Sequence, residues 1–174
     1  KVGMGRVAAA VAANALRRRG APALIVDSGT AITVDVVDQH GSFLGGAIMP
    51  GVRLAAIALN ERTDGLPRII PLDSPPPSIG ANTEDAIRSG LYWGTFGGVK
   101  ELIARHRASL TGEADLFLTG GAAVWSHLLQ NARLTPGLTL MGVAEIAKAR
   151  IASERDSHSN GSRQSPPLDC GEKP

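Results

Sequence analysis

Three short segments of the sequence carry residue types that can bind a phosphate group. In the first, DSGTAITVD, Asp27 ends a short apolar run and directly precedes Ser28, Gly29 and Thr30. In such a turn, backbone N–H groups and a hydroxyl face an anion, while the carboxylate can hold a cation or a water molecule. DSGT is equally a good hairpin turn. The segment therefore predicts a phosphate and cation site or an ordinary hairpin.

The other two segments are glycine-rich helix starts. Thr119–Gly121 follows an apolar run, and such a turn lets a phosphate or an adenosine approach closely, although many turns of this kind use glycine only for packing. Gly3–Ala8 matches the G-x-G-x-x-A pattern of dinucleotide-binding proteins, with Asp27 about twenty residues further on. No strand precedes Gly3 and a hairpin, not a crossover helix, follows Asp27. A dinucleotide-binding module is thus one alternative.

A sheet flanked by helices is needed to position these segments. Hydrophobic patterns and turn residues predict helices at 6–19, 52–59, 82–107, 122–129 and 141–153, and strands at 23–27, 31–37, 42–48, 116–118 and 138–140. Three strands in a row followed by alternating helices and strands indicate a mixed α/β fold rather than a simple βαβ wind. Glycines at positions 90, 94, 97 and 98 suggest close packing of the long helix against another helix or a second subunit.

The composition excludes several classes of protein. With 43% hydrophobic and only 3% aromatic residues, the chain can build a core, and that core must be aliphatic. A single cysteine, Cys170, excludes a disulfide-stapled domain and favours a reducing compartment. The net charge of +2, with Arg17–Arg19 as the densest basic cluster, does not favour a nucleic-acid partner. No apolar run approaches the ~20 residues of a membrane span, so we expect a cytoplasmic protein without a membrane partner.

Taken together, the segments resemble the type III pantothenate kinases, members of the actin, sugar-kinase and chaperone ATPase superfamily. The matching pieces occur in one order along the chain. They are Gly3-x-x-Arg6 with its Ala-rich helix, Asp27–Asp35, Phe43–Gly51, Leu66-Pro67, Ile79–Thr83 with Ala86-Ile87-x-x-Gly90, and Leu118–Gly121. This set covers the chain from about Gly3 to Ala149 and is more specific than any single motif.

The resemblance implies an enzyme that phosphorylates the hydroxyl of pantothenate with ATP in coenzyme A synthesis. It implies an RNase-H-like, actin-like ATPase fold, with the cleft between two lobes and usually a homodimer. By the same resemblance, Asp27 holds a monovalent cation (K⁺ or NH₄⁺), and ATP contacts Gly29, Thr30, Gly120 and Gly121. Pantothenate would contact Gly3, Met4, Gly5, Arg6 and Thr83, with the arginine able to pair with its carboxylate.

Two departures from the family pattern reduce the expected activity. The family motif reads Gly-x-Asp-Arg, and the aspartate that serves as base is replaced by Gly5. The first lobe, whose acidic loop serves ATP and Mg²⁺, is expected to be missing. Residues 1–22 would then be a helix connecting to that lobe, 23–155 the C-terminal lobe and 156–174 a disordered tail. We expect weak or no kinase activity, with a non-catalytic ligand-sensing or regulatory homologue as a further alternative.

Overall fold

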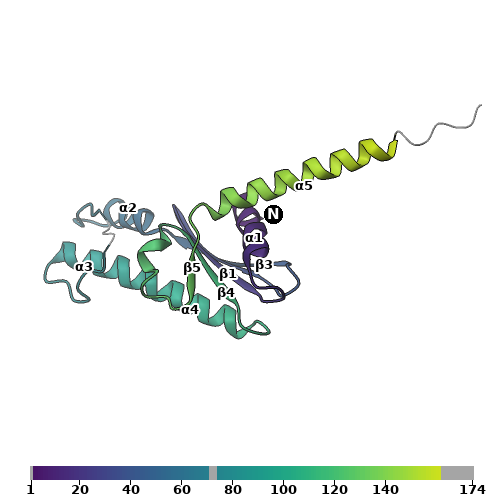
Figure 1. Cartoon of the computed structure of the whole chain (residues 1–174). Coiled ribbons are helices and arrows are strands. Elements are labelled where there is room, and N and C mark those ends of the chain that lie inside the picture. Colours follow the sequence, from purple (N-terminus) through teal and green to yellow (C-terminus); the bar gives the residue numbers. More distant parts are fainter. Residues whose placement is uncertain (1, 71–73, 162–174) are drawn as a thin grey trace, which may run out of the picture.

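A five-stranded mixed sheet forms the centre of the protein in the computed structural model, which describes residues 2–70 and 74–161, with side chains described as far as 155 (Figure 1). The strands are β1 (Ala23–Ser28), β2 (Ala31–Val37), β3 (Phe43–Pro50), β4 (Asp115–Gly120) and β5 (Ala132–Leu134). Their order is β3-β2-β1-β4-β5. β1 to β3 form an antiparallel meander, whereas β4 and β5 run parallel to β1. This arrangement confirms the mixed α/β, RNase-H-like fold.

Helices lie on both faces of the sheet. They are α1 (Met4–Leu16), α2 (Val52–Arg62), α3 (Thr83–Ser89), α4 (Thr95–Ala108) and α5 (Leu138–Gly161), with a π-helical turn η1 (Gly90–Gly94) and a 3₁₀ turn η2 (Gly121–Trp125). Within the described part of the chain, none of these helices is long and apolar enough to cross a membrane. The tail expected at 156–174 overlaps the end of α5, and residues 162–174 lie outside the described residues.

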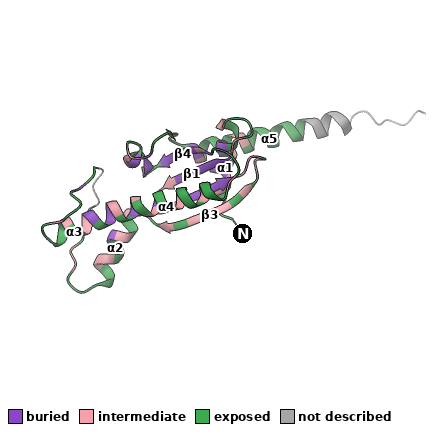
Figure 2. Ribbon diagram, turned by 90° about the horizontal axis from the view of Figure 1, so that it is seen from below, coloured by how far each residue is buried: buried purple, intermediate pink, exposed green. Residues whose placement is uncertain are grey.

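The two faces of the sheet carry different cores, because successive side chains of a strand point to opposite faces. One face packs against α4 and η2 through aliphatic side chains and Trp125. The other face packs against α1 and the start of α5, and its cluster includes Ile25, Phe117 and Leu138. In Figure 2 the buried residues concentrate in the sheet and on the inner sides of these helices. Among the residues whose burial is described, Trp125 and Phe117 are the fully buried aromatic side chains, so the core is mainly aliphatic, as expected from the composition.

Small residues let α1 and α5 approach each other closely. On α1, Ala9, Ala12 and Ala13 are all at most 2% exposed. On α5, a Cβ added at Gly142 would lie 1.7 Å from the carbonyl oxygen of Ala8, a distance at which the backbone itself must move. The alanine-rich face of α1 therefore serves close helix packing, and Gly142 is the residue of α5 that permits it.

Some elements differ from the sequence-based expectation. Residues 138–140 are the first turn of α5 and not a strand, and the helix expected at 122–129 is the shorter η2. The last strand of the sheet is instead β5, which is three residues long and has no recognisable period. Pairing with β4, a tertiary contact, selects β5, and burial of Leu138 against the sheet fixes the start of α5.

The glycines of the long helix coincide with a change of helix type. The expected helix from 82 to 107 is present as α3, η1 and α4 in succession, and Asn82 caps it by accepting a hydrogen bond from the Asp85 N–H at 2.9 Å. An added Cβ would meet nothing at Gly90, Gly94 or Gly97, whereas at Gly98 it would lie 3.3 Å from Met49. Within the described chain, close packing thus explains only Gly98.

The contact between α1 and α5 can be tested with two Gly→Ala variants. Gly142→Ala is expected to reduce the free energy of unfolding by about 1–3 kcal/mol, because the added methyl group forces the two helices apart. Gly97→Ala, in an exposed part of α4 with open space around the Cβ position, is expected to raise it by about 0.4–1 kcal/mol. Urea denaturation followed by circular dichroism measures both, and equal effects of the two variants would contradict the packing argument.

Candidate functional site

The carboxyl ends of two neighbouring parallel strands meet at one edge of the sheet. In the register of β1 and β4, Asp27 lies opposite Thr119 and Ser28 lies opposite Gly120. The backbone at Gly120 has φ 62°, and a Cβ there would lie 2.5 Å from the Ser28 carbonyl oxygen and 2.7 Å from Asp27 Oδ1. Only glycine allows the second glycine-rich turn to pass this close to the first. The structure therefore brings together the two motifs singled out in the sequence.

The sheet face beneath α1 and α5 becomes polar toward this edge. Asp27 pairs across the strands with Thr33 and Thr119, and Asp35 pairs with Ile25, so all of these side chains share one face. Thr119 and Asp35 are only 3% and 1% exposed, respectively. A polar cluster thus continues directly from the apolar core formed with α1.

Arg6 in the first turn of α1 forms a partly buried ion pair with Asp35. The Arg6 Nε donates to Asp35 Oδ1 at 2.9 Å and to Oδ2 at 3.2 Å, and Nη2 also donates to Oδ1. The guanidinium carbon of Arg6 lies 5.5 Å from the centre of the Phe43 ring. The hydrogen bonds with Asp35 raise the pKa of Arg6, with burial acting in the opposite direction. Asp35 occupies the Nε and Nη2 groups, and within the described part of the chain the Nη1 group of Arg6 donates no hydrogen bond, so it can serve another acceptor.

Asp27 has a carboxylate with no salt bridge within the described chain. Burial raises its pKa above the ordinary value, the negative charge of Asp35 raises it further, and a hydrogen bond with the Thr139 side chain lowers it. Asp35 is balanced by Arg6, whereas Asp27 has only a neutral hydroxyl as a partner. A bound cation would remove this imbalance.

Position 5 is open. Gly3 is the N-cap of α1, and its carbonyl oxygen accepts from the N–H groups of Arg6 and Val7, while Met4 is 73% exposed. A Cβ at Gly5 would meet only the Thr139 Cγ2 atom, at 4.0 Å. There is room here for the aspartate of the family motif, next to the threonine that hydrogen-bonds Asp27.

A cavity of about 550 Å³ lies beside the two turns. It is lined by Ser28, Gly29, Thr30, Val52, Arg53, Leu54, Ile57, Gly121, Val124 and Trp125. Hydroxyls, turn backbone and the Arg53 guanidinium suit a phosphate group, and the apolar residues suit a flat base. Gly51 supports the first turn, because its N–H donates to the Thr30 carbonyl oxygen at 3.0 Å.

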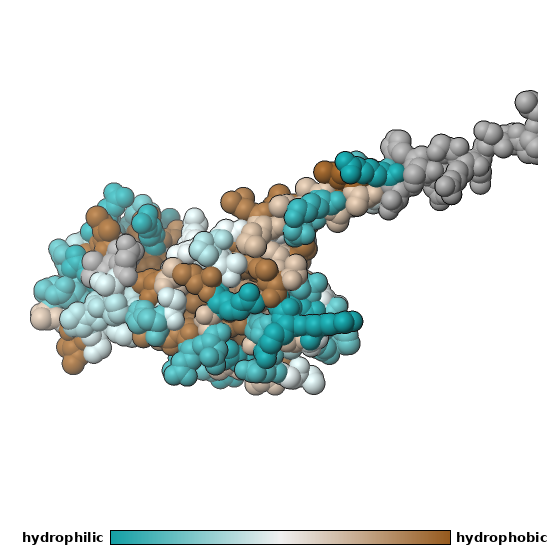
Figure 3. All heavy atoms as spheres, in the orientation of Figure 1, coloured by the Kyte–Doolittle hydropathy of each residue, from teal (hydrophilic) through white to brown (hydrophobic). Residues whose placement is uncertain are grey.

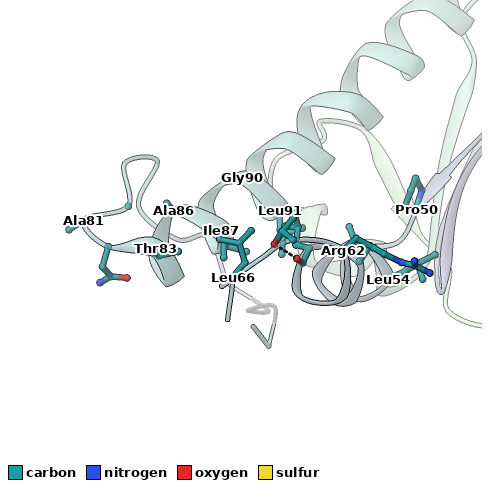
Figure 4. A pocket seen from close by; sticks show the side chains of 16 residues that line it. Pro50, Leu54, Arg62, Leu66, Ala81, Thr83, Ala86, Ile87, Gly90 and Leu91 are labelled. Carbon is teal, nitrogen blue, oxygen red and sulfur yellow. Dashed lines mark hydrogen bonds between the residues drawn. The ribbon is translucent and has the colours of Figure 1, made fainter. Parts of the chain in front are cut away.

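Thr83 does not join this cluster. It lines a larger and more open groove of about 1240 Å³ between α2 and α3, together with apolar residues such as Leu54, Leu66 and Ile87 (Figure 4). α3 lies at the opposite end of the body from α1 in Figures 1 and 2. Residues of the two turns line the smaller cavity, and Asp27 directly precedes the first turn, so we assign the candidate site to this end of the sheet. Leu54 lines both cavities.

The donor set fits a cation bound by oxygen atoms. Among the described residues, no group of three or more His, Cys, Asp and Glu side chains could hold a metal ion. Asp27, the Thr139 hydroxyl and nearby backbone carbonyls are hard oxygen ligands, which suit a monovalent cation and not a zinc or copper ion.

Some residues of the site were not among those expected from the sequence. Asp35 stands at the end of the first motif, but its pairing with Arg6 is a contact across 29 residues. Arg53 follows the Pro50-Gly51 turn without any recognisable pattern. Thr139 lies in a segment expected to be a strand. A polar residue in the middle of an apolar strand, as at Asp35, is the one sequence signal that points to such a site.

Known proteins similar to this chain point to one family. A family model described as type III pantothenate kinase matches residues 1–105. The type III pantothenate kinase of Rubrobacter xylanophilus is 42% identical over 149 residues, which are 82% of this chain and 56% of that protein. The corresponding protein of Acidobacterium capsulatum is 36% identical over 162 residues, which are 92% of this chain and 58% of that protein.

The chain spans only about half of the length of the curated relatives that it matches. A solved Campylobacter jejuni structure, described as a Baf family transcriptional activator, superposes with a TM-score of 0.64 at 22% identity and covers 87% of this chain and 66% of that one. This likeness concerns the fold. The family model matches more than half of the residues, and on that match this protein belongs to the type III pantothenate kinase family.

Proposed function

We propose that this chain provides one lobe of a pantothenate kinase, in which ATP phosphorylates the hydroxyl of pantothenate in coenzyme A synthesis. The observation that carries the proposal is the meeting of the two glycine-rich turns, Asp27 and Arg6 at one end of the sheet. Phosphoryl transfer depends mainly on positioning and on electrostatic stabilisation, and this cluster offers groups for both.

ATP would occupy the cavity beside the turns. Gly29, Thr30 and Gly121 line it, and Gly120 shapes the turn that closes it. Arg53 would face the phosphates, and a monovalent cation at Asp27 would offset negative charge close by. Mg²⁺ would arrive with ATP and be held by the acidic loop of the first lobe. The protein contributes a preformed anion site, and the cation contributes charge.

Pantothenate would bind at the first turn of α1. Its carboxylate would accept hydrogen bonds from the Arg6 guanidinium, which Asp35 and Phe43 hold in place. Gly3, Met4 and Gly5 would form the adjoining wall. Because position 5 lacks the carboxylate that takes up the proton of the attacking hydroxyl, binding is supported here better than turnover.

The glycine at position 5 favours a second candidate function. A protein that keeps the ion pair and both turns but lacks the base can still bind pantothenate or nucleotide. Such a homologue would sense a ligand or regulate a partner without catalysis. Thermal stabilisation by ligand without turnover would distinguish this function from that of a slow kinase.

Thr83 supports the proposal of a homodimer. It lies at the opposite end of the body from Arg6, so it can reach pantothenate bound at Arg6 only if it comes from a second copy. The open apolar groove between α2 and α3, with Leu54 43% exposed, offers a surface for that copy. Each site would then combine α1 of one copy with α3 of the other.

The role of position 5 can be tested by restoring the base. When the first lobe of the Rubrobacter xylanophilus relative is joined ahead of Val2, Gly5→Asp is expected to raise ATP-dependent phosphorylation of pantothenate by about 10²–10⁴-fold. ADP release measures the rate. Gly5→Asn, with a side chain of the same size that cannot take up the proton, is the matched control and should give no such gain. Turnover at an ordinary kinase rate with glycine in place would contradict the proposed defect.

The cation site can be tested through stability. Potassium chloride is expected to raise the melting temperature of the chain above that in tetramethylammonium chloride of equal ionic strength, because the cation balances the half-buried Asp27 carboxylate. Asp27→Asn should abolish this difference. A potassium effect that survives in Asp27→Asn would place the cation elsewhere.

The same variant has a predicted pH dependence without potassium. The pKa of Asp27 is higher in the folded than in the unfolded state, so its charge destabilises the fold at neutral pH, and this cost disappears as the pH falls below the unfolded value of ~3.9. Asp27→Asn should therefore melt at a higher temperature than the wild type at pH 7, with a difference that shrinks in acid.

Asp38 is expected to behave in the opposite way. Backbone hydrogen bonds, chiefly from the Ser42 N–H, lower the pKa of Asp38, so Asp38→Asn should lower the melting temperature of the protein at pH 7.

The homodimer can be tested with two Leu→Asp variants. The wild-type chain is expected to sediment as a dimer, and Leu54→Asp in the groove should convert it to a monomer because a buried unpaired charge is costly. Leu44→Asp replaces an equally apolar, 60% exposed residue of β3 outside the groove and should leave the dimer intact. Analytical ultracentrifugation measures the masses, and a monomeric wild type would disprove this arrangement.

A further inference from the structure

Two cavities lie at the edge of the sheet opposite the candidate site, where β4 begins beside the start of β1. They have volumes of about 480 Å³ and 410 Å³ and lie between the end of α4 and the segment that joins η2 to β5. Arg107 and Gln130 line both cavities, so the two adjoin, and we call the pair the α4 cleft. No residue of the glycine-rich turns lines the α4 cleft, which is therefore separate from the cavity proposed for ATP.

The smaller of the two cavities reaches down to the main core. Ile103, Leu116 and Leu129 line it and are only 4%, 2% and 8% exposed. All three belong to the cluster that packs α4 and η2 against the sheet, and we call them the floor of the α4 cleft. An aliphatic group that displaces water from such a floor is stabilised by the hydrophobic effect. The floor therefore suits a short alkyl chain.

Two cationic side chains of α4 border this floor. Lys100, Ala104 and Arg107 all line the smaller cavity, and their spacing of four and three residues places them on one face of the helix. Within the described chain, neither Lys100 nor Arg107 forms a salt bridge, whereas the neighbouring Arg105 pairs with Glu101 at 2.7 Å. The helix dipole accounts for basic residues in the last turn of α4, but not for Lys100 near its middle.

The carboxylates of the larger cavity already have a cationic partner. The Arg18 Nε donates to Asp115 Oδ1 at 2.7 Å, and Nη1 donates to Glu113 Oε2 at 3.5 Å. Burial acts to raise the pKa of Asp115, but hydrogen bonds from the backbone and side chain of Arg18 outweigh it, so this pKa is lowered. Arg107 is thus left for an anion from outside the chain. In the space-filling view, hydrophilic side chains gather over the end of α4 (Figure 3).

We propose that the α4 cleft binds a small aliphatic oxyanion, a carboxylate or a phosphate monoester on a short alkyl chain. The oxyanion would accept hydrogen bonds from Arg107, whose guanidinium can bind either group in a bidentate manner, and Lys100 would add a second positive charge. The alkyl chain would lie on the floor. A cavity of about 410 Å³ is within the usual size range of small-molecule sites, and the adjoining cavity leaves room for a polar group beside Gln130. The proposal does not depend on kinase activity.

The test uses hexanoate and hexyl phosphate as probes and hexanol as their uncharged control. Each is titrated into the protein, and proton–nitrogen correlation spectra report which backbone amides respond. Saturable shifts are expected at residues 100–107 and 128–131 with one or both anions, and the tighter anion identifies the preferred head group. Hexanol should bind about tenfold more weakly or worse, because it cannot form the charge-assisted hydrogen bonds.

Two exposed arginines of α4 provide matched variants. Arg107→Gln is expected to raise the Kd of the preferred anion by about tenfold or more. Arg105 is about 200° away around the helix and lines neither cavity, so Arg105→Gln should leave the Kd unchanged. Circular dichroism verifies that both variants are folded.

Four results would overturn the proposal. They are the absence of saturable binding of both anions, hexanol binding as tightly as the anions, equal effects of the two arginine variants, and shifts centred on the turns at Gly29 and Gly120. The last result would place the anion in the cavity proposed for ATP. Phosphorylation is not measured, so this test is independent of that of the kinase proposal.

Discussion

The central strand β1 imposes the main constraint on this fold. Ala23 to Val26 are fully buried, so every backbone N–H and C=O group of this segment must find a partner within the protein. β2 supplies the partners on one edge in an antiparallel ladder and β4 supplies them on the other in a parallel ladder. Because β1 and β4 run in the same direction, their carboxyl ends coincide. Asp27 and the Gly120 turn are thereby brought to within van der Waals distance.

The two aspartates of the motif, Asp27 and Asp35, differ in their electrostatic environment. Asp35 is buried and fully paired with Arg6, a geometry in which removal of either partner would leave an unpaired buried charge. Asp27 lies on the same face with a hydroxyl as its partner, and burial together with the negative charge of Asp35 raises its pKa. The proposed roles follow from this difference. The paired arginine is held in place to receive a carboxylate, and the unpaired aspartate is ready to receive a cation.

Close packing of small residues links the site to the end of the chain. Gly142 allows α5 to lie against Ala8, and this contact places Thr139 between Gly5 and Asp27. Beyond this contact, residues 146–155 of α5 are exposed. One helix crossing therefore determines the geometry at position 5.

Local pattern alone determined a large part of this structure. The alanine-rich run, the β-branched meander and the Asn82 cap predict α1, β1 to β3 and the long helix, because each depends on interactions between residues close in sequence. The motif residues Asp27, Gly29, Thr30, Gly120 and Gly121 were also recognisable, since turns have strong local preferences. Only the tertiary structure decided that β5 is a strand, that 138–140 belong to a helix, and that Asp35 holds Arg6 while Thr83 lies far away. These features depend on contacts between residues that are distant in sequence, and such contacts produce no periodic pattern in the sequence.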